Sequence, residues 1–157
     1  MAGKIDKRLS ELGIELPKAA IPVANYVPVT FARGLAFVAG QVTVWNGEFR
    51  YIGKLGKEYQ IADGQAAARL CGLNILAQMK SALNGDLDRV QRCLKLTVFV
   101  NSVDDFTDQP KVANGVSDLM TEVFGDAGRH ARSAVGVPVL PLGAAVEIDA
   151  VVAVRAA

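Results

Sequence analysis

The chain has 157 residues and a formal net charge of +1, with 51% hydrophobic, 21% charged and 6% aromatic residues. This length is typical of one domain, which buries roughly 68–70% of the surface of its unfolded chain and needs neither disulfides nor a structural metal for stability. The balance of 17 basic and 16 acidic residues, with no basic patch, argues against a nucleic-acid partner.

Histidine and cysteine are scarce. His130 is the only histidine, and Cys71 and Cys93 are the only cysteines, so we expect no metal site. Both cysteines fall within predicted secondary structure and are interpreted as buried thiols in a reducing compartment. Residues 1–12 lack the apolar core of a secretory signal, and no uncharged run reaches the ~20 residues of a membrane span. We therefore expect a soluble, cytoplasmic protein without a membrane partner.

The N-terminal part of the chain, residues 1–25, is interpreted as an extension with one short helix. That helix is predicted over residues 6–12, before Gly13, and the following segment contains Pro17, Pro22 and Pro28, which favour extended backbone.

The main domain is expected over residues 26–157. It begins with strands over 27–31 and 35–44 that are joined by a short turn, and Asn46-Gly47 predicts a second tight turn. The remaining predicted elements are a helix over 62–84, a strand over 93–101, a helix from 110 to 124, and strands over 131–139 and 145–154.

This order predicts an α+β domain with two helices packed on one face of a mixed β-sheet. The other face has no helix left to cover it and is expected to carry Arg132, Glu147, Asp149, Lys95 and Thr97. Self-association is the simplest way to cover a face that mixes small residues with a few charges.

Arg132 and Glu147 are the strongest candidates for chemistry. An arginine within an apolar strand needs an anion, and its planar group binds a carboxylate through two hydrogen bonds. The alternative is a structural ion pair with Glu147 or Asp149. If the last two strands form a hairpin, Gly136 rather than Arg132 lies opposite Glu147, which disfavours that pair within one subunit. Partial burial would raise the pKa of Glu147 and suit it to acid–base work on water, but a solvated strand position is also possible.

Two further features are weaker. His130 has no nucleophile visibly paired with it in the sequence, so a loop or pocket-rim position is expected. The run from Gly53 to Lys57 looks like a phosphate loop only superficially, because Glu58 stands where serine or threonine is required.

Several motifs resemble the RidA/YjgF family, also called the endoribonuclease L-PSP family. The segment HARSAVGVPVLPLGAAVEIDAVVAV, residues 130–154, is similar to its C-terminal signature, an Ala-Arg-Ser strand, a Leu-Pro turn and a Val-Glu-Ile strand. Ala39-Gly40-Gln41 resembles the Ser-Gly-Gln segment of its second strand, and residues 96–100 with Asp105-Phe106 resemble its central strand and helix entry. The resemblance spans most of residues 26–154 and indicates a divergent branch of longer chains.

The resemblance implies a chorismate-mutase-like fold assembled as a homotrimer, with pockets in the clefts between subunits. It also implies hydrolysis of reactive enamine and imine intermediates to 2-oxo acids and ammonia, as in 2-iminobutanoate/2-iminopropanoate deaminases, without cofactor or metal. The expected ligand is a small metabolite that carries a carboxylate.

Six residues are carried over from the family pattern. Arg132 matches the arginine that holds the substrate carboxylate, and Glu147 matches the acid that positions or activates water. The other four match residues of the substrate pocket: Tyr26, Gly40, Asn114 and Ala134. Ala134 replaces the common cysteine and Ala39 the common serine, which puts the substrate and the deaminase activity in question.

The sequence is also compatible with two other functions. One is a trimer that binds small carboxylates without turnover, suggested by the two alanine replacements. The other is the endoribonuclease activity in the family's older name, which the near-neutral charge and the single histidine disfavour.

Overall fold

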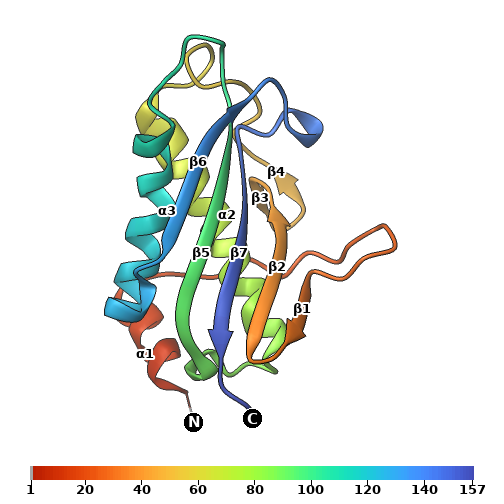
Figure 1. Ribbon diagram of the computed structural model, residues 1–157, viewed down its shortest axis with the longest axis vertical. Helices are drawn as coiled ribbons and strands as arrows, with labels where there is room; N and C mark the ends of the chain where they lie inside the picture. The colour runs from red at the N-terminus through yellow and green to blue at the C-terminus, as the bar shows by residue number, and fades with distance from the viewer. Residues whose placement is uncertain (1) are drawn as a thin grey trace.

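The computed structural model describes residues 2–157 as an α+β fold in which helices cover one face of a sheet (Figure 1). The helices are α1 (Lys4–Glu11), α2 (Ile61–Ala82) and α3 (Gln109–Phe124), with short 3₁₀ turns η1 (Leu87–Arg89), η2 (Gly125–Gly128) and η3 (Pro141–Gly143). The strands are β1 (Val29–Ala32), β2 (Leu35–Gln41), β3 (Val44–Trp45), β4 (Glu48–Phe49), β5 (Val90–Asn101), β6 (Ala131–Val137) and β7 (Val146–Val154). The predicted α+β class, with helices on one face of a sheet, is confirmed, and the helices number three where two were expected.

The main sheet has the order β1-β2-β7-β5-β6 and is mixed, because β5 and β6 are parallel while the other neighbours are antiparallel. The last two strands do not form the hairpin that the sequence analysis considered, since β5 lies between β6 and β7. Residues 140–143 therefore connect two strands that are not neighbours. The helix α3 joins β5 to β6, which is the usual way to connect parallel strands.

Alternating side chains divide the sheet into a buried face and an open face. In β7 the buried residues are Val146, Ile148, Ala150, Val152 and Val154, and they pack with the apolar stripes of α2 and α3. The opposite face has no helix over it, and two of its apolar side chains, Phe37 and Val135, are each 44% exposed. The predicted uncovered face is confirmed.

Both tight turns expected from the sequence are present. Arg33 and Gly34 connect β1 to β2, and Asn46 and Gly47 connect β3 to β4, all four with positive φ. Two adjacent residues with positive φ suit the right-handed twist of a hairpin, which is why Asn-Gly is favoured there.

The first helix is held by a carboxylate from a distant part of the chain. Asp88 accepts hydrogen bonds from the backbone N–H groups of Lys4 and Ile5, each at 2.8 Å. These bonds satisfy two of the unpaired donors at the start of α1 and lower the pKa of Asp88. The segment after α1 crosses to the other side of the molecule and forms a loop that projects beyond β1 (Figure 1).

Candidate functional site

Arg132 lies on β6, at the edge of the sheet. Its neighbour in the adjacent strand β5 is Leu96, which is fully buried beneath the helices. Because paired residues of neighbouring strands point to the same side of a sheet, Arg132 belongs to the helix-covered face. Arg132 was expected on the same open face as Glu147, and this expectation is wrong. The alternation of β6 was predicted correctly, but the arginine belongs to its helix side, where the edge position lets the guanidinium reach past the core to α3.

Three neutral acceptors hold the guanidinium of Arg132. Its Nη1 donates to Asn114 Oδ1 at 2.9 Å and to Ser117 Oγ at 3.0 Å, and its Nη2 donates to the Pro110 carbonyl oxygen at 3.3 Å. Within residues 2–157, no carboxylate lies within ion-pair distance of Arg132, and two of its five N–H donors remain for a ligand. The positive charge is thus oriented but not neutralised.

Ala134 lies two residues further along β6, on the same face as Arg132 and partly buried against the core. The structure therefore brings together Arg132, Asn114 and Ala134, three of the six predicted site residues. We call these three residues the arginine group.

Glu147 lies on the open face of the sheet, on β7. Burial raises the pKa of its carboxyl group above the ordinary value of 4.5, and the negative charge of Asp149 adds to the rise. Gly40 on β2 makes room for this carboxylate, because a Cβ atom at position 40 would lie 2.8 Å from Glu147 Oε1.

Tyr26 and Gly40 line a shallow cavity of about 470 Å³ together with Ala39 and Asp149. Tyr26 is 57% exposed on the projecting segment before β1. Tyr26, Gly40 and Glu147 thus form a second group of predicted residues on the open face, which we call the glutamate group.

The two groups are separated within one chain. On β5, Arg132 pairs with Leu96 and Glu147 pairs with Phe99. The two residues are therefore separated by two strand spacings across the sheet and by three residues along the strands, and each separation is on the order of 10 Å. They also face opposite sides of the sheet. A single chain does not bring Arg132 and Glu147 to one ligand.

Several other predicted features have structural roles. Lys54, in the run that looks like a phosphate loop, donates to Asn101 Oδ1 at 2.8 Å and to the Pro138 carbonyl oxygen, which ties this loop to the end of β5 and to the segment after β6. Cys71 and Cys93 are buried free thiols, as predicted, and burial raises the pKa of Cys93 to about 12. Thiols with so high a pKa are poor nucleophiles.

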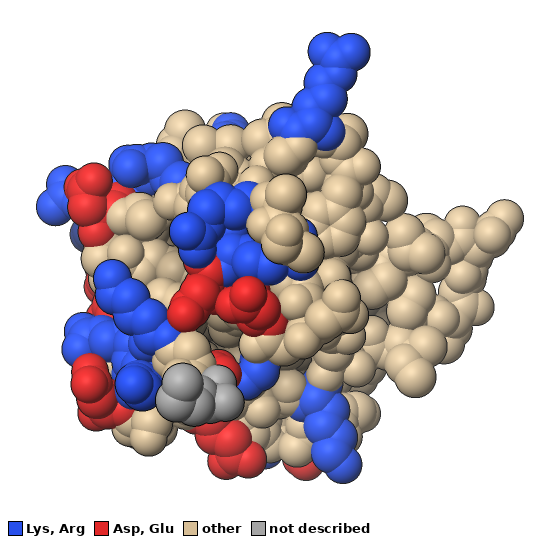
Figure 2. Space-filling view, turned by 90° about the horizontal axis from the view of Figure 1, so that it is seen from below, with Lys and Arg blue, Asp and Glu red and all other residues tan. Residues whose placement is uncertain are grey.

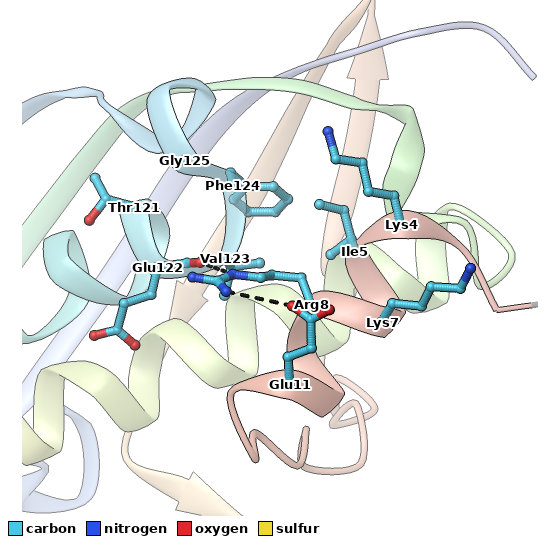
Figure 3. A pocket seen from close by; sticks show the side chains of 10 residues that line it. All are labelled: Lys4, Ile5, Lys7, Arg8, Glu11, Thr121, Glu122, Val123, Phe124 and Gly125. Atoms are coloured by element: carbon cyan, nitrogen blue, oxygen red, sulfur yellow. Dashed lines mark hydrogen bonds and ion pairs between the residues drawn. The ribbon is translucent and has the colours of Figure 1, made fainter.

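A cavity of about 640 Å³ lies between α1 and the end of α3 (Figure 3). Arg8 lies at its centre, where its Nε donates to the Glu122 carbonyl oxygen at 2.8 Å and its Nη1 pairs with Glu11 at 3.6 Å. None of the six predicted site residues lines this cavity.

Charged side chains of both signs are interspersed on the face shown in Figure 2, while the projecting segment at its right carries little charge. That face therefore offers no uniformly basic surface for a nucleic-acid backbone. No helix within residues 2–157 is both long and apolar enough to cross a membrane.

The fold and the two polar groups define a class: a small α+β domain with an oriented arginine at one sheet edge and a glutamate on the open sheet face. The family model that matches, "YjgF/chorismate_mutase-like, putative endoribonuclease", covers residues 6–152. The chain belongs to this RidA/YjgF family.

Individual relatives agree with this assignment. Protein TCP17 of Trypanosoma cruzi is 51% identical over 96% of this chain and 94% of its own length. The crystal structure of Atu1372 from Agrobacterium tumefaciens, a protein of unknown function, is 48% identical with a TM-score of 0.90 over 96% of this chain and 92% of that one. Escherichia coli TdcF with bound serine is 26% identical with a TM-score of 0.62 over 90% and 97% of the two chains.

Proposed function

We propose that the protein hydrolyses small imines that carry a carboxylate, giving a 2-oxo acid and ammonia. The observation that carries this proposal is Arg132, a cation oriented by neutral acceptors and paired with no carboxylate among residues 2–157. Such a group binds a carboxylate through charge-assisted hydrogen bonds and fixes its orientation. The bound serine of TdcF, a family relative, is itself a carboxylate ligand.

Glu147 supplies the acid–base group of the proposed reaction. Its carboxylate takes a proton from water as the water oxygen bonds to the imine carbon, and the carboxyl then returns the proton to nitrogen. The hydroxyl proton of the resulting carbinolamine then passes through the same carboxylate to the amino nitrogen. The C–N bond breaks and ammonia leaves, with the carbonyl oxygen derived from water. A pKa above the ordinary value suits this exchange, because both protonation states are then accessible closer to neutral pH.

The working unit in this proposal is a homotrimer in which the arginine group of one subunit meets the glutamate group of its neighbour. The separation of the two groups within one chain supports this arrangement, and so does the sheet face that no helix covers. A ligand between subunits would then contact residues from both.

The test uses 2-iminopropanoate generated by an amino-acid oxidase in the presence of semicarbazide, which traps the imine. An active protein lowers the rate of semicarbazone formation. Arg132→Ala should lower kcat/KM by about 30-fold or more, since it removes a charged partner of the substrate. Arg132→Lys keeps the charge but loses the planar group, so its kcat/KM should lie between those of wild type and Arg132→Ala.

Arg50→Ala is the matched control, because Arg50 contacts the Trp45 ring and belongs to neither group. It should keep full activity. A wild-type protein that leaves semicarbazone formation unchanged, or an Arg132→Ala variant as active as wild type, would contradict the proposal. Calorimetric binding of a 2-oxo acid without any turnover would instead indicate a binding protein.

A further inference from the structure

Ser117 and His130 form a hydrogen-bonded pair that the sequence did not reveal. The Ser117 side chain on α3 and the His130 ring before β6 meet with Oγ and Nε2 2.9 Å apart. Asn114, Ser117 and Thr121 recur at helical spacing, so α3 presents them on the side that faces β6.

The other ring nitrogen of His130 fixes the direction of this hydrogen bond. Its Nδ1 lies 2.7 Å from the Gly128 carbonyl oxygen, and a carbonyl can only accept. In the neutral ring the proton is therefore on Nδ1, and Nε2 accepts the proton of the Ser117 hydroxyl.

The backbone at Gly128 keeps this arrangement rigid. Gly128 is buried, and a Cβ atom there would lie 2.0 Å from the Met120 carbonyl oxygen, so only glycine permits the 3₁₀ turn η2 to fold back on α3. The carbonyl that orients His130 is thus fixed by packing. A hydroxyl, a base and a group that orients the base are the three parts of an activated serine nucleophile.

The pair opens into a polar cavity of about 340 Å³ lined by Ser117, Asp118, Thr121, Arg129, His130 and Arg132. Arg132 Nη1 donates to Ser117 Oγ at 3.0 Å, so a positive charge lies beside the serine oxygen and favours loss of its proton to His130. The same arginine offers its remaining N–H donors to an anionic substrate.

We propose that Ser117 and His130 are the nucleophile and general base of an acyl-transfer site that takes small esters or thioesters bearing a carboxylate. Ser117 Oγ bonds to the acyl carbon while its proton passes to His130 Nε2. The bond to the leaving alcohol or thiol then breaks, and Nε2 returns the proton to that group. Water, deprotonated by the same nitrogen, releases the acid and restores the serine.

This activity goes beyond the imine hydrolysis proposed above and does not require Glu147. The two sites share Arg132 only. A Glu147→Gln variant should therefore lose imine hydrolysis and keep the serine reactivity, so that either proposal can fail without the other.

The first experiment treats the whole protein with diisopropyl fluorophosphate, which phosphorylates activated serines with loss of fluoride. Intact-mass spectrometry should show one adduct, and peptide mapping should place it on Ser117. Ser117→Ala should abolish labelling, and His130→Gln should slow it by at least about tenfold, since it removes the base. Peptide mapping of the wild-type adduct gives the answer even if Ser117→Ala does not fold.

Ser133→Ala is the matched control, because Ser133 on β6 lies outside this cavity, and its Oγ accepts a hydrogen bond from Lys95 Nζ at 2.9 Å. It should label like wild type. Absence of the adduct, an adduct on another residue, or equal labelling rates in wild type and His130→Gln would each overturn the proposal and leave the pair as a structural link between α3 and β6.

A second experiment tests the substrate class. The wild type should hydrolyse the mono-4-nitrophenyl ester of succinate at least about tenfold faster than 4-nitrophenyl pentanoate, which has a similar size but no charge. Arg132→Gln should remove this preference. Equal rates for the two esters in the wild type would contradict the assignment of carboxylate-bearing substrates.

Discussion

The carboxyl group of Glu147 links pH to the stability of the fold. Because its pKa is raised in the folded chain, the protonated form is favoured there, and this contribution to stability is present below the ordinary value of 4.5 and lost as pH rises through the folded pKa. Glu147→Gln resembles the protonated form at every pH. The variant should melt at most a few degrees above wild type at pH 7, and the difference should vanish near about pH 4. The measurement is thermal unfolding of both proteins across this pH range. A melting-temperature difference, variant minus wild type, that is smaller at pH 7 than at pH 4 would contradict the prediction.

Gly40 provides space for the same carboxylate. Gly40→Ala places a Cβ atom 2.8 Å from Glu147 Oε1 and should displace it, lowering kcat of the proposed imine hydrolysis by about tenfold or more. The control is the double variant with Glu147→Gln. If Gly40 acts through Glu147, the alanine should cause little further loss in that background.

The position of Arg132 shows what a single sequence can predict at this scale. The alternation of side chains correctly predicted that Arg132, Ala134 and Gly136 share one side of their strand. The family resemblance pointed to Asn114, which contacts Arg132. Alternation does not say which of the two sides faces the helices, and charge suggested the wrong one. Ser117 and His130 are 13 positions apart and meet only because α3 and β6 pack together, so no local pattern reveals them.

At the scale of elements, the two main helices pack closely because small residues line their contact. A Cβ atom at Gly115 on α3 would lie 2.1 Å from the Gln65 carbonyl oxygen on α2, which is backbone and cannot turn aside. Gly115→Ala should therefore lower the free energy of unfolding by about 1–3 kcal/mol, in spite of the better helix propensity of alanine. Urea denaturation checks this, and a variant as stable as wild type would contradict the close packing.

Helix and strand positions were predicted well because they depend on local periodicity. The predicted helix over 62–84 corresponds to α2 at Ile61–Ala82, and the strand over 93–101 lies within β5 at Val90–Asn101. Strand neighbours depend on contacts far apart in the sequence, so the insertion of β5 between β6 and β7 was not predicted. The carboxylate of Asp88 at the start of α1 was missed for the same reason.

At the scale of the whole molecule, a site shared between subunits can be tested by mixing two inactive variants. Arg132→Ala and Glu147→Gln subunits, unfolded and refolded together, should regain imine hydrolysis, because about a quarter of the interfaces then carry both wild-type side chains by chance. Each variant refolded alone should stay inactive. Native mass spectrometry should show an assembly of three times the 16.6 kDa chain mass. A monomer, or no recovery in the mixture, would contradict the shared site.

The central place of β7 also affects how the chain acquires its structure during synthesis. The strand that joins β2 to β5 is the last of the seven to leave the ribosome, so until it emerges the sheet exists only as two separate halves with unpaired inner edges. Such edges invite pairing with other chains. We expect nascent chains halted before Val146 to depend on chaperones, whereas chains released with β7 can complete the sheet in a single closing step.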